Sequence, residues 1–513
     1  MIWKGLAAAA VLATSGAAQA TWQEASSKHF VVYANDTPDK LRAFTAKLER
    51  FDKAMRALRG LDDPAVSPTQ RVSVYVLDDQ GDIAKLYGRG GDGVAGFYNA
   101  RASGPVAFVP RKGDGGGKFA LTPQQVLFHE YAHHLMYSTM GGYYFPAWYV
   151  EGFAEFSATA DVQDDGSVVF GAVPMYRLYG IANLSPMTAK ALLTANPQRL
   201  PADQRETVYG RGWLLTHYLT VDEGRRKQLA DYLHALNQGK PAAQAAAALD
   251  LPTLDRRLAG YTHEKLRGFT VPARILTVGE VTLRTLTPGE AAVMPARLLS
   301  TRGVNPKTAP RVVALAKRLA APFPNDPGAQ NVLAEAEFDA GDPQAALAAA
   351  DRALAADPRS LHAMAYRGLA LQAIALKTEG KDAPAAFKRA RAAFVAANRA
   401  DHDAPWPLEL NYLSYLAPGH KPSPNAEDGL LQAAALAPYD DDLSLLAAKV
   451  LLERDKPGEA TPYLRPLASN PHGGVAALFA SKLLTLIDAG DKAGAHALFA
   501  TEPVKDAAGK EDK

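Results

Sequence analysis

His129, Glu130 and His133 lie close together in the stretch VLFHEYAHHLM (126–136), in a chain that has only 12 histidines. On a helix, residues four positions apart lie one turn above each other, so His129 and His133 point the same way and can reach one metal ion. Glu130 lies about 100 degrees further round the helix, where its carboxylate reaches a water molecule on the ion without being a ligand. The chain has no cysteine, so His, Asp or Glu must hold any metal. The pattern predicts a zinc site with Glu130 as general base.

A third ligand is required, because catalytic zinc usually has three protein ligands and one open position for water. The stretch WYVEGFAEF (148–156) follows closely enough for a helix-turn-helix to bring Glu151 back against the histidines. Glu155 lies one turn further along the same face, where it can accept the other ring N–H of a ligating histidine and fix its tautomer. The spacing therefore predicts His129, His133 and Glu151 as metal ligands. Histidines satisfied by hydrogen bonds in the core are the alternative.

The segments HEYAH and WYVEGFAEF together resemble the gluzincin metallopeptidases, particularly the peptidase MA-like domains of exported bacterial proteins, which often stand beside tetratricopeptide (TPR) repeats. The resemblance covers about residues 21–269, with strong motif support only over 128–156. It implies an α+β zincin-like fold, Zn²⁺ as cofactor, and hydrolysis of peptide bonds. His129, His133 and Glu151 are the zinc ligands by this resemblance. Glu130 takes a proton from the activated water and delivers a proton to the leaving amine.

The resemblance also implies a donor for the oxyanion that forms during hydrolysis. In aminopeptidase N-like enzymes a tyrosine about sixty residues after the glutamate ligand has this role. Tyr209, in ETVYGRGWLL, lies at a comparable distance and is expected to open a helix. A core aromatic side chain is the alternative for Tyr209. His217 and Arg211 are further candidates, whereas His134 points to a different helix face and is expected to be structural.

One departure from the related aminopeptidases favours an endopeptidase. Those enzymes carry a Gly-x-Met-Glu-Asn strand whose acid binds the free amine of the substrate, and the segment GFYNARAS has no acid there. A hairpin predicted over 93–110 offers an edge strand to which an extended peptide can add through main-chain hydrogen bonds. An ordinary edge covered by a loop is the alternative.

The elements that position these residues follow from local patterns. Strands are predicted at HFVVYAND and RVSVYVLD with a helix over 37–60 between them, so residues 21–120 should form a mixed sheet. Residues 121–270 are expected to be a helical lobe that carries the zinc site. Its first helix has Thr122 as N-cap and Gln125 in a capping-box position. A second helix starts near Pro146, and a third is broken near Gly224.

Beyond a β-rich connection expected at residues 271–305, the chain becomes alanine-rich and repetitive. The unit over 329–358 resembles a TPR, and degenerate partners close at Pro405, Pro438 and Pro471. Because one repeat cannot bury its own apolar face, several must stack. An all-α, TPR-like solenoid that binds protein partners is therefore expected over residues 306–502. An irregular helical bundle is the alternative.

The two ends of the chain have distinct compositions. Lys4, the apolar run 6–14 and the small-x-small site Ala18-Gln19-Ala20 predict a signal peptide over residues 1–20, and hence a periplasmic or secreted protein of a bacterial envelope. A retained anchor helix is the alternative. No later apolar stretch is long enough to span a bilayer. The net charge of +2 gives no electrostatic case for nucleic acid. The tail 503–513 is expected to be disordered.

Two functions from different classes fit these patterns. The first is an exported zinc metalloendopeptidase with a repeat scaffold for protein binding. The second is a non-catalytic interaction scaffold of the envelope, with a structural or relic metal site. The coexistence of Glu130, three ligands and a supporting carboxylate favours the enzyme.

Overall fold

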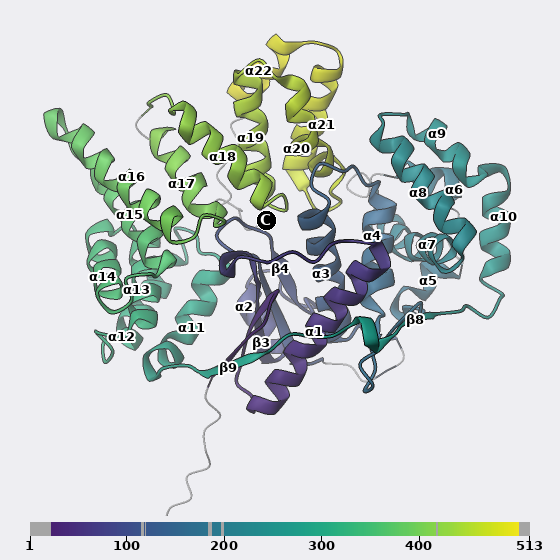
Figure 1. The fold of residues 1–513 in the computed structure, drawn as a ribbon, viewed down its shortest axis with the longest axis horizontal. Helices are drawn as coiled ribbons and strands as arrows, with labels where there is room; N and C mark the ends of the chain where they lie inside the picture. The colour runs from purple at the N-terminus through teal and green to yellow at the C-terminus, as the bar shows by residue number, and fades with distance from the viewer. Residues whose placement is uncertain are drawn as a thin grey trace, which may run out of the picture.

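The protein is mostly helical, with a small sheet region (Figure 1). The computed structural model describes residues 22–113, 117, 119–182, 187–195, 200–416 and 419–501. The expected signal peptide and the expected disordered tail lie outside the described residues. Within the part of the chain that is described, no helix is both long and apolar enough to cross a bilayer.

A six-stranded mixed sheet forms the centre of the N-terminal half, in the order β4-β5-β3-β2-β1-β9. The strands β2, β3 and β5 run parallel, and the other neighbours are antiparallel. The predicted order of strand, helix, strand and hairpin is present, with β1 and α2 in addition. The elements are β1 (Gln23–Ser26), β2 (Phe30–Ala34), α1 (Pro38–Arg59), β3 (Val72–Asp79), α2 (Gln80–Tyr87), β4 (Phe97–Asn99), β5 (Val106–Lys112) and β9 (Thr282–Thr285).

Alternation along the parallel strands gives the sheet two apolar faces. Val32 and Val74 lie on the face that packs against α1 and α3 (Pro123–Thr139). Tyr33, Tyr75 and Phe108 are aligned by the register on the other face, where α2 and α11 (Pro288–Arg302) cover them. The sheet is therefore the middle layer of three, and α3 lies directly on it.

A helical lobe follows the sheet, as predicted for residues 121–270. The capping box between Thr122 and Gln125 is present at the start of α3. The break in the third long helix lies at Asp222, close to the predicted Gly224. The further elements are α4 (Ala147–Ala158), β6 (Asp161–Val162), β7 (Val168–Phe170), α5 (Leu178–Ile181), α6 (Ala189–Leu193), α7 (Ala202–Val221), α8 (Glu223–Asn237), α9 (Ala242–Ala245), α10 (Leu251–Tyr261) and β8 (Phe269–Val271).

The prediction of a separate β-rich connection over 271–305 is wrong. The strand β8 completes a three-stranded sheet with β7 and β6, and β9 pairs with β1 at the edge of the large sheet. The rest of the segment is α11, which begins with Pro288 at its first position and a capping box between Thr287 and Glu290. This helix start could be recognised in the sequence by the same signature that identified α3.

The C-terminal half is an array of helices in which each helix packs against the next, and alternate helices such as α13 and α15 also touch. Small residues allow this close packing: Ala334, Ala349 and Ala353 are completely buried. The array begins with α11, earlier than expected. Its helices after α11 are α12 (Ala309–Ala320), α13 (Pro327–Asp339), α14 (Pro343–Ala356), α15 (Leu361–Ala375), α16 (Ala383–Ala400), α17 (Pro405–Leu416), α18 (Pro424–Leu436), α19 (Asp441–Glu453), α20 (Pro457–Ser469), α21 (Gly474–Asp488) and α22 (Lys492–Thr501).

The array curves around the sheet so that its last helices return to the helical lobe (Figure 1). The backbone N–H of Ala102, just after β4, donates a hydrogen bond of 2.6 Å to Asp440 in the turn before α19. Arg465 of α20 donates to the backbone oxygen of Asn237 at the end of α8. The turn after α18 and helix α20 thus lie against the loop after β4 and the end of α8.

Candidate metal centre

Close helix packing sets the position of the predicted third ligand. Every residue of α4 from Trp148 to Ala158 is buried, and α4 packs between α3 and α7. Gly152 and Gly212 make the approach of α4 to α7 possible. A Cβ atom on Gly152 would lie only 2.3 Å from the backbone oxygen of Gly212. Glu151, next to this contact, is therefore held on a rigid and buried helix.

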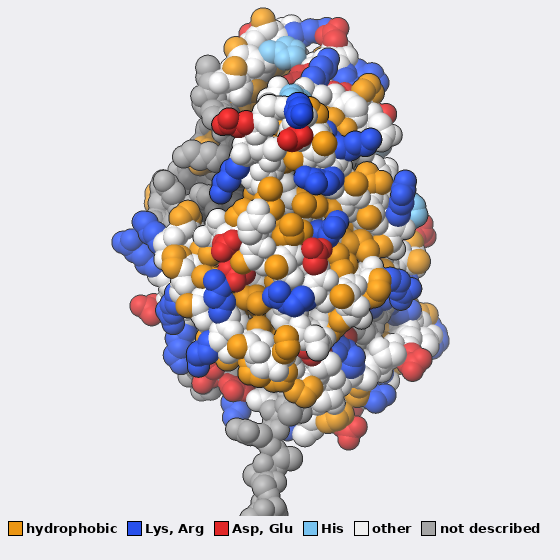
Figure 2. Space-filling view, turned by 90° about the vertical axis from the view of Figure 1, so that its left-hand side faces the viewer, with side chains coloured by type: hydrophobic (Ala, Val, Ile, Leu, Met, Phe, Trp, Pro, Cys, Tyr) orange, Lys and Arg blue, Asp and Glu red, His pale blue; other side chains and the backbone are white. Residues whose placement is uncertain are grey.

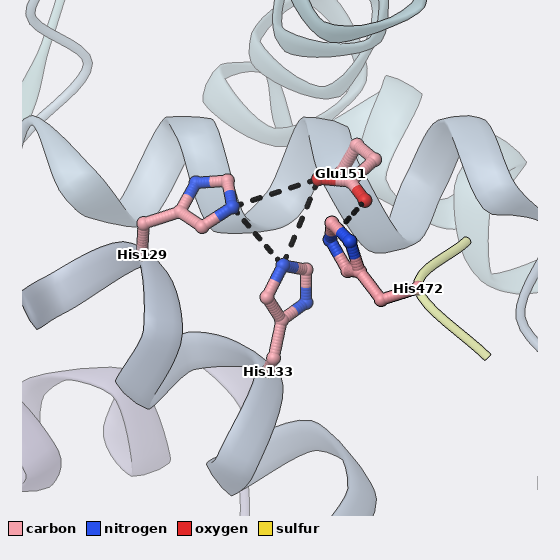
Figure 3. A group of neighbouring side chains, drawn as sticks. All are labelled: His129, His133, Glu151 and His472. Atoms are coloured by element: carbon pink, nitrogen blue, oxygen red, sulfur yellow. Dashed lines mark hydrogen bonds and ion pairs between the residues drawn. The ribbon is translucent and has the colours of Figure 1, made fainter. Parts of the chain in front are cut away.

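The side chains of His129, His133 and Glu151 converge on one point between α3 and α4 (Figure 3). The two Nε2 atoms of the histidines lie 3.1 Å apart. Each of them lies 3.6 Å from Oε2 of Glu151. The structure thus brings together the three residues that the sequence pattern selected as ligands.

A fourth side chain, which no motif in the sequence indicated, joins this group. His472 lies in the turn between α20 and α21, and its Nε2 atom is 3.0 Å from Oε1 of Glu151. One ligand atom from each of the four residues lies within 4.8 Å of the others. The only local signal was a histidine after Pro471, the closing proline of a repeat. Nothing local relates it to partners so far away along the chain.

The donor set fits a zinc ion. Glu151 is completely buried, yet neither of its carboxylate oxygens has a hydrogen-bond partner among the described residues, and His133 Nδ1 is in the same state. The approach of His472 lies within ion-pair distance but lacks hydrogen-bond geometry. Burial of a carboxylate without hydrogen-bond partners is unfavourable for the free energy of folding unless a cation pairs with it. Imidazole nitrogens with one carboxylate are ligands typical of zinc.

The electrostatics of the group also favour a cation. Burial raises the pKa of Glu151, but the neighbouring His472 and His133 outweigh it and hold this pKa well below its usual range. Burial and the nearby His133 lower the pKa of His129 well below its ordinary value, so its ring is neutral, as metal binding requires. Partial burial lowers the pKa of His472, but the Glu151 carboxylate outweighs it and raises this pKa to about 9, so a metal ion that takes this ring as a ligand must displace its proton.

Glu130 lies on α3 between the two histidines and is partly buried. Burial raises the pKa of its carboxyl above the ordinary value, and the charges of His133 and His472 oppose this shift. A raised pKa brings a carboxylate closer to the range in which it exchanges protons at neutral pH. This environment suits the predicted general base.

Glu155 lies behind His129, as its position on α4 predicts. Its Oε1 atom is 3.6 Å from Nδ1 of His129, which is longer than a hydrogen bond. The hydrogen bonds to this buried carboxylate come from elsewhere: Tyr176 donates at 2.8 Å and Arg177 at 2.9 Å. Glu155 is therefore held rigidly beside the histidine by two residues that the sequence pattern did not indicate.

Tyr209 lies near the histidines, but the expectation that it opens a helix is wrong, because α7 begins at Ala202. Its ring lies 6.4 Å from the ring of His129, centroid to centroid, and the Arg177 guanidinium lies 4.5 Å from the Tyr209 centroid. His217, another candidate for the same role, lies apart from the group: its ring nitrogens contact Tyr261 Oη at 2.9 Å and the backbone oxygen of Gly171 at 3.2 Å.

The remaining candidates also lie apart from the metal centre. Arg211 is buried with a guanidinium nitrogen 3.7 Å from Asp255 Oδ1. His134 is on a different face of α3, as expected, where Tyr98 Oη lies 2.7 Å from its Nδ1 and the Tyr439 ring is 5.0 Å away. The edge strand β4, which contains Tyr98, lies next to α3 at the border of the large sheet.

A second group of possible metal ligands, His29, Asp52 and Asp63, forms a buried ion network instead. Arg56 satisfies Asp52 with a hydrogen bond of 2.8 Å, and it also lies within ion-pair distance of Asp63. Tyr131, between the two histidines of α3, donates to Asp52 at 2.7 Å. The network therefore ties α3, the helix that carries His129 and His133, to α1.

Comparisons with known proteins give little further information. No protein-family model matches the chain, and no curated protein matches it. Among solved structures, a thermophilic TPR protein of Thermus thermophilus is similar to part of the chain, with 20% sequence identity and a TM-score of 0.33. The match covers 39% of this chain and 100% of that chain. A TM-score of this size does not establish a common fold, and the repeat architecture rests on the helix packing described above.

Proposed function

We propose that the protein is a zinc-dependent endopeptidase of the gluzincin type, with a zincin-like domain followed by a TPR-like helical array. The observation that carries this proposal is the buried Glu151 carboxylate, which has no hydrogen-bond partner among the described residues and faces the Nε2 atoms of His129 and His133. His129, His133 and Glu151 would hold the ion. A zinc ion bound there supplies Lewis acidity and lowers the pKa of a water molecule toward neutrality.

The protein side chains transfer the protons, stabilise the oxyanion and position the ligands. Glu130 accepts a proton from the attacking water and donates it to the leaving amine, so one carboxylate acts first as base and then as acid. Tyr209 is the donor to the oxyanion, since its ring lies near His129, and burial together with the Glu151 charge raises its pKa and keeps the hydroxyl protonated. Glu155 keeps the ring of His129 in place through its own anchors Tyr176 and Arg177.

The edge strand β4 is the proposed binding place for an extended peptide substrate. It is the last strand of the large sheet on the side next to α3, and it pairs only with β5 in the described sheet. Main-chain hydrogen bonds to an edge strand give affinity without strong sequence preference. This binding mode agrees with an endopeptidase, because the segment GFYNARAS around β4 has no acid to bind a free amine.

The helical array is proposed to bind protein partners, and the signal-like N-terminal sequence supports export to the bacterial envelope. On one side of the array, apolar side chains are exposed to solvent between lysines and arginines (Figure 2). Leu376 and Val395 are two of the exposed large apolar residues in this half of the chain. Mixed apolar and basic surfaces of this kind are suited to protein contacts.

The test is to replace the proposed base and measure zinc and cleavage separately. In Glu130→Gln, cleavage of casein or a peptide library should fall by about 10²–10⁴-fold, because general base catalysis is lost, while zinc content stays stoichiometric. The matched control is Glu264→Gln, at an exposed position after α10, which should cleave like the wild type. Equal cleavage by wild type and Glu130→Gln would overturn the role of Glu130.

A non-catalytic scaffold with a structural metal site is the second candidate, and one observation favours it. His472 adds a fourth side chain to the group, and structural zinc sites are closed by four protein ligands. Stoichiometric zinc with no cleavage by the wild type would support this alternative.

A further inference from the structure

His472 reaches the metal centre from a part of the chain that has no other role there. The other three ligands come from α3 and α4, which are buried on the large sheet and against α7. His472 comes from the turn between α20 and α21, near the end of the helical array (Figure 3). A connection between the array and the site therefore passes through this side chain.

The distances suit four ligands of a single ion. With metal–ligand distances of about 2.0–2.1 Å, ligand atoms at the corners of a tetrahedron are roughly 3.3 Å apart. The observed separations are 3.1 Å between the two Nε2 atoms of α3 and 3.6 Å from each of these to Glu151 Oε2. His472 Nε2 lies 3.0 Å from the other carboxylate oxygen, Oε1, and all four residues have a ligand atom within 4.8 Å of one another. Without a metal the last approach is that of an ion pair, and a metal ion bound between the two groups would replace it.

A fourth protein ligand has a direct consequence for hydrolysis. A catalytic zinc site needs an open position for water, and four protein ligands occupy all positions of a tetrahedral site. With His472 bound, the site is closed to water. It can then act on a peptide only after this histidine leaves.

The turn that carries His472 can move more easily than the other ligands. The His472 side chain is 55% exposed, whereas Glu151 is completely buried. Two glycines follow His472, and Gly474 has a positive φ of 50°, a conformation that glycine adopts readily. A side-chain hydrogen bond from Asn470 to Asp441, long at 3.3 Å, ties the turn to α19.

The array is docked against the same region by contacts independent of the metal. The ring of Tyr439 packs on His134 at 5.0 Å, and Asp440 accepts the backbone N–H of Ala102. A Cβ atom on Gly142 would lie 3.2 Å from Pro462 of α20, so the end of α3 lies close against the array. The turn that carries His472 belongs to this docked part of the array. A movement of α20 and α21 away from α3 would therefore withdraw His472 from the ion.

We propose that His472 is a displaceable fourth zinc ligand, through which the helical array holds the site closed to water. This inference rests on the proposed metallopeptidase function. Displacement breaks the bond between the ion and His472 Nε2 and lets one water molecule take its place, with no net redox change. A protein or peptide that binds the array and shifts the turn would thus activate the enzyme.

The test compares full-length wild type with His472→Ala and His472→Gln, each loaded with cobalt(II) in place of zinc. Loss of one nitrogen ligand should change the visible absorption of cobalt and should weaken zinc binding by at least about tenfold, since even partners of ligands contribute 10–100-fold. Both variants should also cleave casein faster than the wild type at saturating zinc. His496→Ala, an exposed histidine of α22, is the matched control and should behave like the wild type.

The possible results separate this inference from the proposed function. An unchanged cobalt spectrum and zinc affinity in both His472 variants would overturn the ligand assignment, even if the wild type is a zinc peptidase. A changed spectrum with slower or absent cleavage would overturn the gating role. Absence of bound metal in the wild type would overturn both proposals. Glu151→Ala, which removes a ligand on the rigid helix, should lose metal and activity together, unlike the His472 variants.

Discussion

Glu151 is completely buried, and its two carboxylate oxygens face three imidazole rings at ion-pair distances, without a hydrogen bond to any described residue. Such an arrangement is unfavourable without a cation, because charge in a low-dielectric interior needs a partner. The positions of His129, His133 and Glu151 could be predicted, since four-residue spacing and a short helix-turn-helix are local features. His472 could not be predicted, because its proximity depends on the curvature of a long array. Tyr176 and Arg177, the anchors of Glu155, were missed for a similar reason: they lie in a short 3-10 helix (Met175–Arg177) after β7, which no local pattern relates to Glu155.

Another buried histidine makes stability depend on pH. Burial lowers the pKa of His217 to about 4, from an ordinary value of 6.5. The unfolded chain binds this proton below about pH 6.5, whereas the folded protein does not until about pH 4. The contribution of His217 to the free energy of unfolding is therefore fully present above pH 6.5. It is lost as the pH falls toward 4, by on the order of 1 kcal/mol per pH unit.

The measurement is denaturant unfolding at pH 7.5 and pH 5. His217→Gln should be less stable than the wild type at pH 7.5, because contacts with Tyr261 and Gly171 are disturbed, but should lose less stability on acidification. The exposed His263→Gln is the control and should keep the wild-type difference. An undiminished pH effect in His217→Gln would contradict this assignment.

At the scale of elements, a helix could be predicted where the residues of its first turn form a recognisable capping pattern. The Thr-Pro-x-Gln pattern predicted α3, and the structure has the complete capping box there. The same kind of signal, Thr287 to Glu290, begins α11, which was missed because the segment before it is rich in β-branched residues. The short strand β1 was not predicted either, and β9 was expected only as part of a β-rich connection, not at the edge of the large sheet. Their pairing joins residues from both ends of the domain, and a pairing of that kind is invisible to local periodicity.

The contact between α4 and α7 gives a prediction at this scale. Gly152→Ala should destabilise the protein by about 1–3 kcal/mol, because the new methyl group would overlap the backbone of Gly212 and push the helices apart. Gly260→Ala is the matched control, since a Cβ atom there has no atom within 4 Å among the surroundings described. It should be neutral or more stable by about 0.5–1 kcal/mol, because alanine favours helix. Denaturant unfolding measures both, and equal stabilities would contradict this account of the packing.

The whole molecule is a closed arrangement in which the helical array returns to the domain where the chain began (Figure 1). Helical pairs with buried alanines could be predicted from repeat spacing, because each repeat buries its face against its neighbours. The docking could not, since it depends on contacts such as that between Gln70 and the backbone oxygen of Leu436, which join remote segments. The organisation into two halves can therefore be predicted from the sequence, but their contact at the candidate metal site cannot.

Removal of the metal ion should weaken the contact between the helical array and the rest of the molecule. If one ion joins α3, α4 and the turn that contains His472, zinc should stabilise the docked array as well as the site. At a free zinc concentration 100 times the dissociation constant, the linkage is worth about 2.7 kcal/mol, which corresponds to roughly 100-fold slower exchange for openings that release the ion. Hydrogen exchange measured with zinc and with a chelator should thus differ in α3, α4 and residues 470–473, and not in α12–α14. In His472→Ala the effect should remain in α3 and α4 and vanish in the turn. Equal slowing of the turn in this variant would mean that the array is held by its other contacts alone.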